Sequence, residues 1–105
     1  MNTRAKGSRL EAKSIAWLRA DGATLVFRGK GLRRSANEEG VAQVDLIAFY
    51  PNGWVKFVDV TVSANKARAR KRLESLAKAL GWIKFGEVHI WKPRAKEPER
   101  EEVSA

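Results

Sequence analysis

Two apolar runs separated by a four-residue turn constrain this chain most strongly. Residues 43–49 and 54–63 are rich in β-branched and aromatic side chains, and the turn between them reads Tyr-Pro-Asn-Gly. Proline fixes an early φ value of such a turn, and Asn-Gly tolerates the positive φ values of tight turns. The pattern therefore predicts a β-hairpin. Side chains alternate along its second strand, so Val58, Val60 and Val62 share one face, and Phe57, Asp59 and Thr61 share the other.

Helical periodicity flanks the hairpin on both sides. Residues 8–21 and 65–80 repeat apolar side chains at helical spacing, and a glycine follows each segment as a stop signal. Residues 24–28 and 87–91 favour two more strands, and the helical crossover before the last strand permits parallel pairing. The sequence thus predicts a single α/β domain with a mixed central β-sheet of about four strands flanked by helices.

The charge of the chain is uneven and strongly positive. Lys and Arg number 21 against 12 acids, a formal net charge of +9. Residues 95–105 hold four Glu against two cations, so residues 1–94 carry +11. We expect the domain to span 1–94, with 1–7 as a flexible basic arm, 29–40 as a mobile loop and 95–105 as a charged, disordered tail. A small domain with this charge favours polyanions, of which nucleic acid is the usual one.

Several functional classes are excluded by composition. The chain has no cysteine, so disulfides and thiolate metal sites are ruled out, and a metal would need carboxylates, carbonyls or the single His89. This favours Mg²⁺, with Mn²⁺ as the alternative. His89 itself we expect to be a strand residue facing solvent or a partner. No apolar run has the length of a bilayer span, and residues 1–20 lack a secretory signal, so we expect a cytoplasmic protein with no membrane partner.

Three carboxylates stand where a packed residue is expected. Glu11 falls within the apolar arc of the first helix, and Asp45 and Asp59 lie inside apolar strands, which disfavour Asp. A divalent ion would offset the cost of desolvating them. Simpler roles stay open: Glu11 can pair with a nearby cation, and Asp45 can cap a turn or accept backbone hydrogen bonds. Asp59, between two valines, is the strongest candidate.

The order of these residues resembles a known enzyme superfamily. Gly7-Ser8-Arg9-Leu10-Glu11, then Val44-Asp45-Leu46-Ile47-Ala48, then Asp59-Val60-Thr61 and a helix resemble the PD-(D/E)XK nucleases, nearest to the archaeal-type and phage Holliday junction resolvases. The resemblance covers residues 5–92. It implies a restriction-endonuclease-like fold and a Mg²⁺-dependent, structure-specific DNA endonuclease. It also implies a four-way junction as substrate, a homodimer, and the host cytoplasm as location if the source is viral.

The resemblance also implies a site. Glu11, Asp45 and Asp59 would be metal ligands, with the Val60 carbonyl joining them. The superfamily ends its third motif in Lys, where this chain has Thr61. Thr61 would then belong to the catalytic set by position, and Lys66 or Lys30 would supply the missing charge.

Basic residues near these motifs are candidates for DNA contact. They are Arg28, Lys30, Arg33 and Arg34 in and beside the loop, and Lys66, Arg68, Arg70 and Lys71 on the second helix. A solvated helix face explains the second group equally well. Two other functions stay open: a catalytically impaired nuclease-fold protein that binds DNA without cutting it, and a basic RNA- or ribosome-associated protein.

Overall fold

The computed structural model describes residues 3–29, 44–80 and 86–103. Its elements are α1 (Thr3–Ala20), β1 (Leu25–Arg28), β2 (Leu46–Phe49), β3 (Val55–Thr61), the 3-10 turn η3 (Ser63–Asn65), α2 (Lys66–Leu80), β4 (Gly86–Ile90) and β5 (Glu99–Val103). The hairpin predicted from the sequence is β2–β3. The predicted candidates Lys30, Arg33 and Arg34 lie outside the described residues.

The strands form one mixed sheet in the order β1-β2-β3-β4-β5. Neighbouring strands are antiparallel except β3 and β4, which pair in parallel because α2 carries the chain back between them. The α/β class and the mixed sheet flanked by helices are therefore confirmed, but the strand count is five rather than about four.

The fifth strand corrects the prediction of a disordered tail. Residues 99–103 pair antiparallel with β4, with Val103 opposite Gly86. Val103 is buried in the core, while Glu101 forms ion pairs with Lys66 and Arg70 of α2. The Glu-rich composition reflects a strand at the sheet edge, where charged side chains suit the solvent-facing positions.

The first helix corrects the predicted start of the domain. α1 begins at Thr3, so residues 3–7 belong to a helix and not to a flexible arm. Arg, Ala and Lys at positions 4–6 are good helix formers, which explains the extension past the predicted cap at Ser8. Gly22, with φ of 115°, ends the helix as predicted. None of the described helices is both long and apolar enough to cross a membrane.

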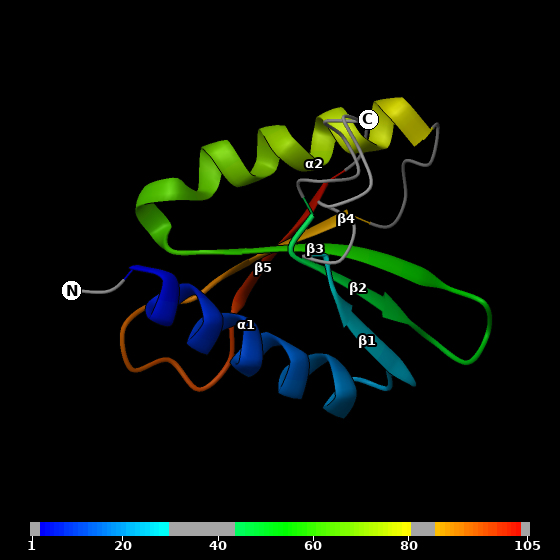
Figure 1. Cartoon of the computed structure of the whole chain (residues 1–105), viewed down its shortest axis with the longest axis horizontal. Helices are drawn as coiled ribbons and strands as arrows, with labels where there is room; N and C mark the ends of the chain where they lie inside the picture. The colour runs from blue at the N-terminus through cyan, green and yellow to red at the C-terminus, as the bar shows by residue number, and fades with distance from the viewer. Residues whose placement is uncertain (1–2, 30–43, 81–85, 104–105) are drawn as a thin grey trace.

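The two helices cover opposite faces of the sheet (Figure 1). Under α1, the core is formed by Leu18, Ala23, Leu46, Ala48 and Val58, with Val60 packed against them. Under α2, it is formed by Val44, Ala69, Leu73, Leu76, Val88, Ile90 and Val103, with Phe57 packed against them. The alternation predicted for β3 is therefore confirmed. Val58 and Val60 face α1, and the side of β3 that carries Asp59 faces α2.

Candidate acidic site

Asp45 and Asp59 lie opposite one another on neighbouring antiparallel strands. Leu46 pairs with Val58, which places Asp45 and Asp59 one step further along. The backbone N–H of Asp45 donates to Asp59 Oδ1 at 3.1 Å, and the N–H of Val60 donates to Asp45 Oδ2 at 2.9 Å. Each carboxylate thus binds the main chain of the other strand.

This exchange also corrects the position of Asp45. It stands just before β2 and not in mid-strand, because its carboxylate takes the Val60 N–H in place of a backbone carbonyl. Accepting backbone bonds was the simpler role that the sequence left open for Asp45. The predicted part of Val60 was its carbonyl, whereas the structure brings its N–H to the acid pair.

Arg72 of α2 supplies the charge nearest to Asp59. Asp59 is fully buried, and Arg72 Nε lies 3.2 Å from its Oδ2 in an ion pair whose geometry falls short of a hydrogen bond. A buried carboxylate is tolerated when it is paired and hydrogen-bonded, and Asp59 is both. Sequence reasoning grouped Arg72 with the other basic residues of the helix, as a solvated face or a phosphate contact, and did not link it to Asp59. Its spacing from Ala69 and Leu76 puts it on the buried side of α2.

Glu11 does not join the two aspartates. Its Oε1 lies 3.1 Å from Arg28 NH1, which also donates to Ser8 Oγ at 3.3 Å. α1 packs on the face of the sheet opposite to the one that Asp59 occupies (Figure 1). Among the described residues, no three His, Cys, Asp or Glu form a group that could hold a metal ion. Glu11 therefore has a cationic partner at its place in the apolar arc, and the half-buried Arg28 is that partner.

The two described candidates for the water-activating role have other partners. Thr61 is buried, its hydroxyl donates to the Val62 carbonyl at 3.4 Å, and its own carbonyl accepts the Trp91 N–H at 2.9 Å. Lys66 is exposed and pairs with Glu101 of β5 at 3.4 Å. The cation found beside the aspartates is Arg72, not Lys66.

The α2 cations predicted to contact DNA fall into two groups, those paired with Glu101 and those not paired with it. Arg70, like Lys66, is tied to Glu101, at 3.2 Å. Arg68 and Lys71 are exposed, one helical turn apart, and neither forms an ion pair with another described residue. These two are the predicted helix cations best placed to meet a phosphate.

A second polar cluster, which the sequence did not predict, lies under α1. His89 is fully buried, with Nδ1 3.0 Å from Ser14 Oγ and Nε2 2.9 Å from Glu87 Oε1. Trp91 Nε1 donates to the same Ser14 oxygen at 2.7 Å. Residues 87, 89 and 91 alternate with the valine and isoleucine that pack under α2, so they share the α1 face. His89 thus faces partners within the fold and not solvent.

Ser14, His89 and Glu87 are the residue types of a nucleophilic triad, but a substrate cannot reach the serine oxygen. Ser14 is fully buried and accepts the indole N–H, so its oxygen has no route to a substrate. The cluster is a structural network that satisfies buried polar groups.

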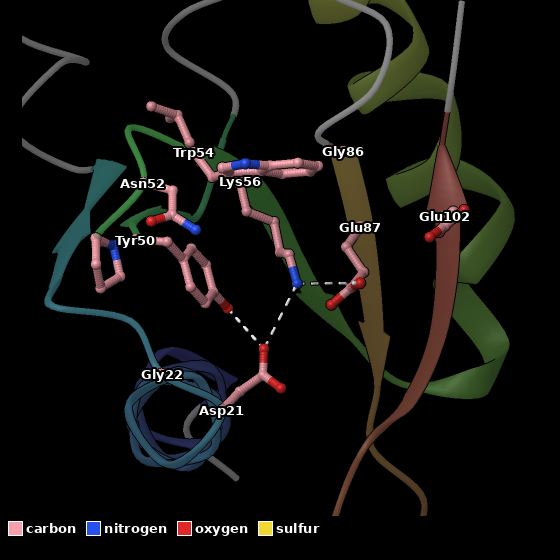
Figure 2. A pocket seen from close by; sticks show the side chains of 11 residues that line it. Asp21, Gly22, Tyr50, Asn52, Trp54, Lys56, Gly86, Glu87 and Glu102 are labelled. Atoms are coloured by element: carbon pink, nitrogen blue, oxygen red, sulfur yellow. Dashed lines mark hydrogen bonds and ion pairs between the residues drawn. The ribbon is translucent and has the colours of Figure 1, made fainter.

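Glu87 also borders a pocket of about 500 Å³ at the other end of β3 and β4, near the end of α1 (Figure 2). Lys56 Nζ lies there 3.5 Å from Glu87 and 3.8 Å from Asp21, and the Tyr50 hydroxyl donates to Asp21 at 2.9 Å. With Glu102, three carboxylates face one ammonium, so this acidic pocket disfavours a phosphate.

The ionisation of the acidic pocket follows from its contacts. Burial raises the pKa of Glu87, but the His89 hydrogen bond and the charges of Lys56 and Arg100 outweigh it and leave the pKa below its ordinary value. Burial and the bond to Asp21 raise the pKa of the Tyr50 phenol well above its ordinary value. Both groups are therefore held in the form they have at neutral pH.

Comparison of the chain with protein-family models, with curated proteins and with solved structures finds no match.

Proposed function

We propose that this protein is a divalent-metal-dependent DNA endonuclease that acts on branched DNA, with a four-way junction as substrate. The observation that carries the proposal is the pairing of Asp45 with Asp59 across two adjacent strands. Strands that are half-buried disfavour aspartate, and two opposed aspartates repel one another unless a cation compensates. The sequence resemblance to PD-(D/E)XK resolvases supports the same assignment.

Asp45 and Asp59 would hold the metal. Their hard carboxylate oxygens suit Mg²⁺ or Mn²⁺, and Mg²⁺ commonly takes one or two protein carboxylates and fills its other positions with water and phosphate oxygens. Two acids therefore suffice, and Glu11 is left out of the ligand set. Bound there, the ion would polarise the phosphodiester and lower the pKa of water.

The chain's own residues would position the DNA around that site. Arg72 already neutralises Asp59 from α2, so it would hold the acid pair ionised and close together. Arg68 and Lys71 would contact phosphates along the exposed face of the same helix. Symmetric cutting of two strands needs two sites, which supports a homodimer with two-fold symmetry.

A second function is favoured by two specific observations. Arg72 stands 3.2 Å from Asp59, and Thr61 replaces the lysine of the third motif. An arginine permanently beside the acid pair suits a nuclease-fold protein that binds DNA and has lost cleavage. The absence of the third-motif lysine suits the same function.

Incubation of labelled four-way junction and matched duplex with Mg²⁺ separates the two functions. We expect wild type to cut the junction and Asp59→Asn to lose at least about 100-fold in rate, since the substitution keeps the shape but removes the charge. Glu87→Gln, which neutralises a buried carboxylate in the other cluster, is the matched control and should cut like wild type. Junction binding without any Mg²⁺-dependent cutting would establish the binding function instead.

A further inference from the structure

A second pocket, of about 430 Å³, lies between α1 and the connection that joins β4 to β5. Arg9 and Lys13 line it from α1, Ser63 from η3, and Lys92 and Arg94 from the connection. Ser63 comes two residues after the end of β3, so this basic pocket opens beyond the carboxyl ends of the parallel strands β3 and β4. Ligands of α/β sheets commonly bind at that edge.

The charge of the basic pocket is opposite to that of the acidic pocket. Four cations and no carboxylate are found among its lining residues. Lys92 is neutralised locally by Glu99 at 3.1 Å, whereas Arg9, Lys13 and Arg94 form no ion pair within the described part of the chain. Three exposed cations around one hollow create a positive potential that attracts an anion.

The three cations line the same pocket from two parts of the chain. Arg9 and Lys13 are four residues apart on α1, so they project from the same helix face. Lys13 Nζ lies 5.5 Å from the centroid of the Trp91 ring, which forms part of the pocket wall. The indole face thus holds the ammonium over the hollow.

Arg94 lines the pocket from the connection between β4 and β5, and its backbone conformation is unusual. Its φ of 63° is the only positive value among the described residues other than glycine. Glycine would adopt this conformation without steric cost, whereas arginine does so with strain. An arginine is therefore present where the turn alone would favour glycine.

We propose that the basic pocket binds a phosphate group of a nucleic-acid strand. The inference rests on the proposed DNA substrate but not on cleavage. Ser63 follows Asp59 by four residues along the chain, so the basic pocket lies at the end of β3 that carries the acid pair. The pocket adds Arg9, Lys13 and Arg94 to the DNA-contacting surface, none of which the sequence motifs had indicated.

Arg94→Gly tests the proposal, because it removes the charge while relieving the backbone. Junction affinity is measured without divalent metal at several salt concentrations. We expect affinity to fall roughly eightfold at 0.1 M salt and the slope of log K against log salt to drop by about one, as for one lost phosphate contact. The thermal midpoint should not fall. The matched control is Lys96→Gly, which removes the same charge two residues away and outside the pocket.

A second pair of variants probes the helix wall. Lys13→Gln should weaken junction binding, whereas Arg19→Gln, on the same helix but outside the pocket, should not. If a variant and its control lost the same junction affinity, in either pair, the loss would reflect net charge alone. That result would overturn the proposal.

Titration with inorganic phosphate, followed by NMR of the backbone amides, distinguishes the source of the anion. We expect the amides of Ser63 and Arg94 to shift, and Arg94→Gly to abolish the shift at Ser63. Phosphate binding with unchanged junction affinity in Arg94→Gly would overturn the nucleic-acid assignment. Failure of wild type to bind any DNA would instead contradict the proposed function itself, whereas loss of cleavage alone leaves the pocket unaffected.

Discussion

The two faces of the sheet each bury a carboxylate, but they neutralise it differently. Under α2, Asp59 is met by a backbone N–H and by Arg72, whose side chain is 32% exposed. Under α1, Glu87 is met by His89, which is fully buried and bonded to Ser14, and by Lys56 at 3.5 Å in the acidic pocket. The arginine beside Asp59 is partly exposed to solvent, whereas the imidazole beside Glu87 is part of the core. This difference explains why we assign chemistry to the aspartates and structure to the histidine network.

The largest effect should come from breaking the network under α1. His89→Ala leaves a cavity and removes partners of Ser14 and Glu87, so we expect the free energy of unfolding to fall by about 3 to 5 kcal/mol. Urea unfolding at pH 7 measures it. Arg72→Ala truncates the cation of the other cluster and serves as the comparison, with a smaller loss because Arg72 is partly solvated. Equal losses of unfolding free energy in His89→Ala and Arg72→Ala would show that the two clusters contribute alike to stability.

The scaffold of the acid pair depends on Gly29. Its N–H donates to the Asp45 carbonyl at 2.8 Å, and a Cβ at this position would collide with the Val44 carbonyl. We expect Gly29→Ala to cost about 2 to 3 kcal/mol of unfolding free energy and to weaken cleavage, because Val44 and Asp45 must shift.

Gly53→Ala is the control for that substitution. Gly53 has φ of 79° and open space around it, so alanine there should cost only about 1 kcal/mol, from backbone strain, and leave cleavage intact. A Gly29→Ala protein as stable and active as Gly53→Ala would contradict the role of Gly29.

Arg72→Gln sharpens the contrast between a partly exposed partner and a fully buried one. Without metal we expect a loss of about 1 to 2 kcal/mol, discounted for the solvation of Arg72. If Arg72 and the metal serve the same acid pair, Mg²⁺ should raise the thermal midpoint of this variant more than that of wild type. Mg²⁺ should raise the thermal midpoint of His89→Ala only as much as that of wild type, because this variant keeps the acid pair unchanged. An equal response of all three proteins would contradict a shared role of Arg72 and the metal at the aspartates.

The smallest effect concerns pH. The pKa of Glu87 is lower in the folded protein than its ordinary value of 4.5, so its contribution is present above that value and is lost as pH falls through the folded pKa. Glu87→Gln should therefore be less stable than wild type at pH 7, and the gap should close as the pH falls below 4.5 and through the folded pKa. Urea unfolding of both proteins across this range checks it, and a constant gap would show that the charge of Glu87 is immaterial.

Local periodicity predicted the elements and the facing of side chains within them, but not how the faces combine. The alternation along β3 placed Asp59 opposite the valines, and the hairpin placed it beside Asp45. Helical phase placed Glu11 in an apolar arc, yet phase does not say which face of the sheet the helix covers. α1 covers the other face, and Glu11 meets Arg28 there.

Long-range partners account for what the sequence did not reveal. Ser14 and His89 are 75 residues apart, and no spacing rule joins them. β5 was missed because an edge strand needs few apolar residues, and Val103 alone anchors its end in the core. Arg72 was hidden within a run of cations, whose composition suggests a solvated face.

Binding of Mg²⁺ at the acid pair tests the central claim most directly, because it requires neither DNA nor catalysis. In an NMR titration of the whole protein, we expect saturable shifts of the Asp45 and Val60 amides, which lie in the hydrogen bonds that join the two aspartates. The His89 amide should not move, and Asp59→Asn should abolish the shifts. Absence of saturable shifts in wild type, or equal shifts in Asp59→Asn, would contradict a metal site at Asp45 and Asp59.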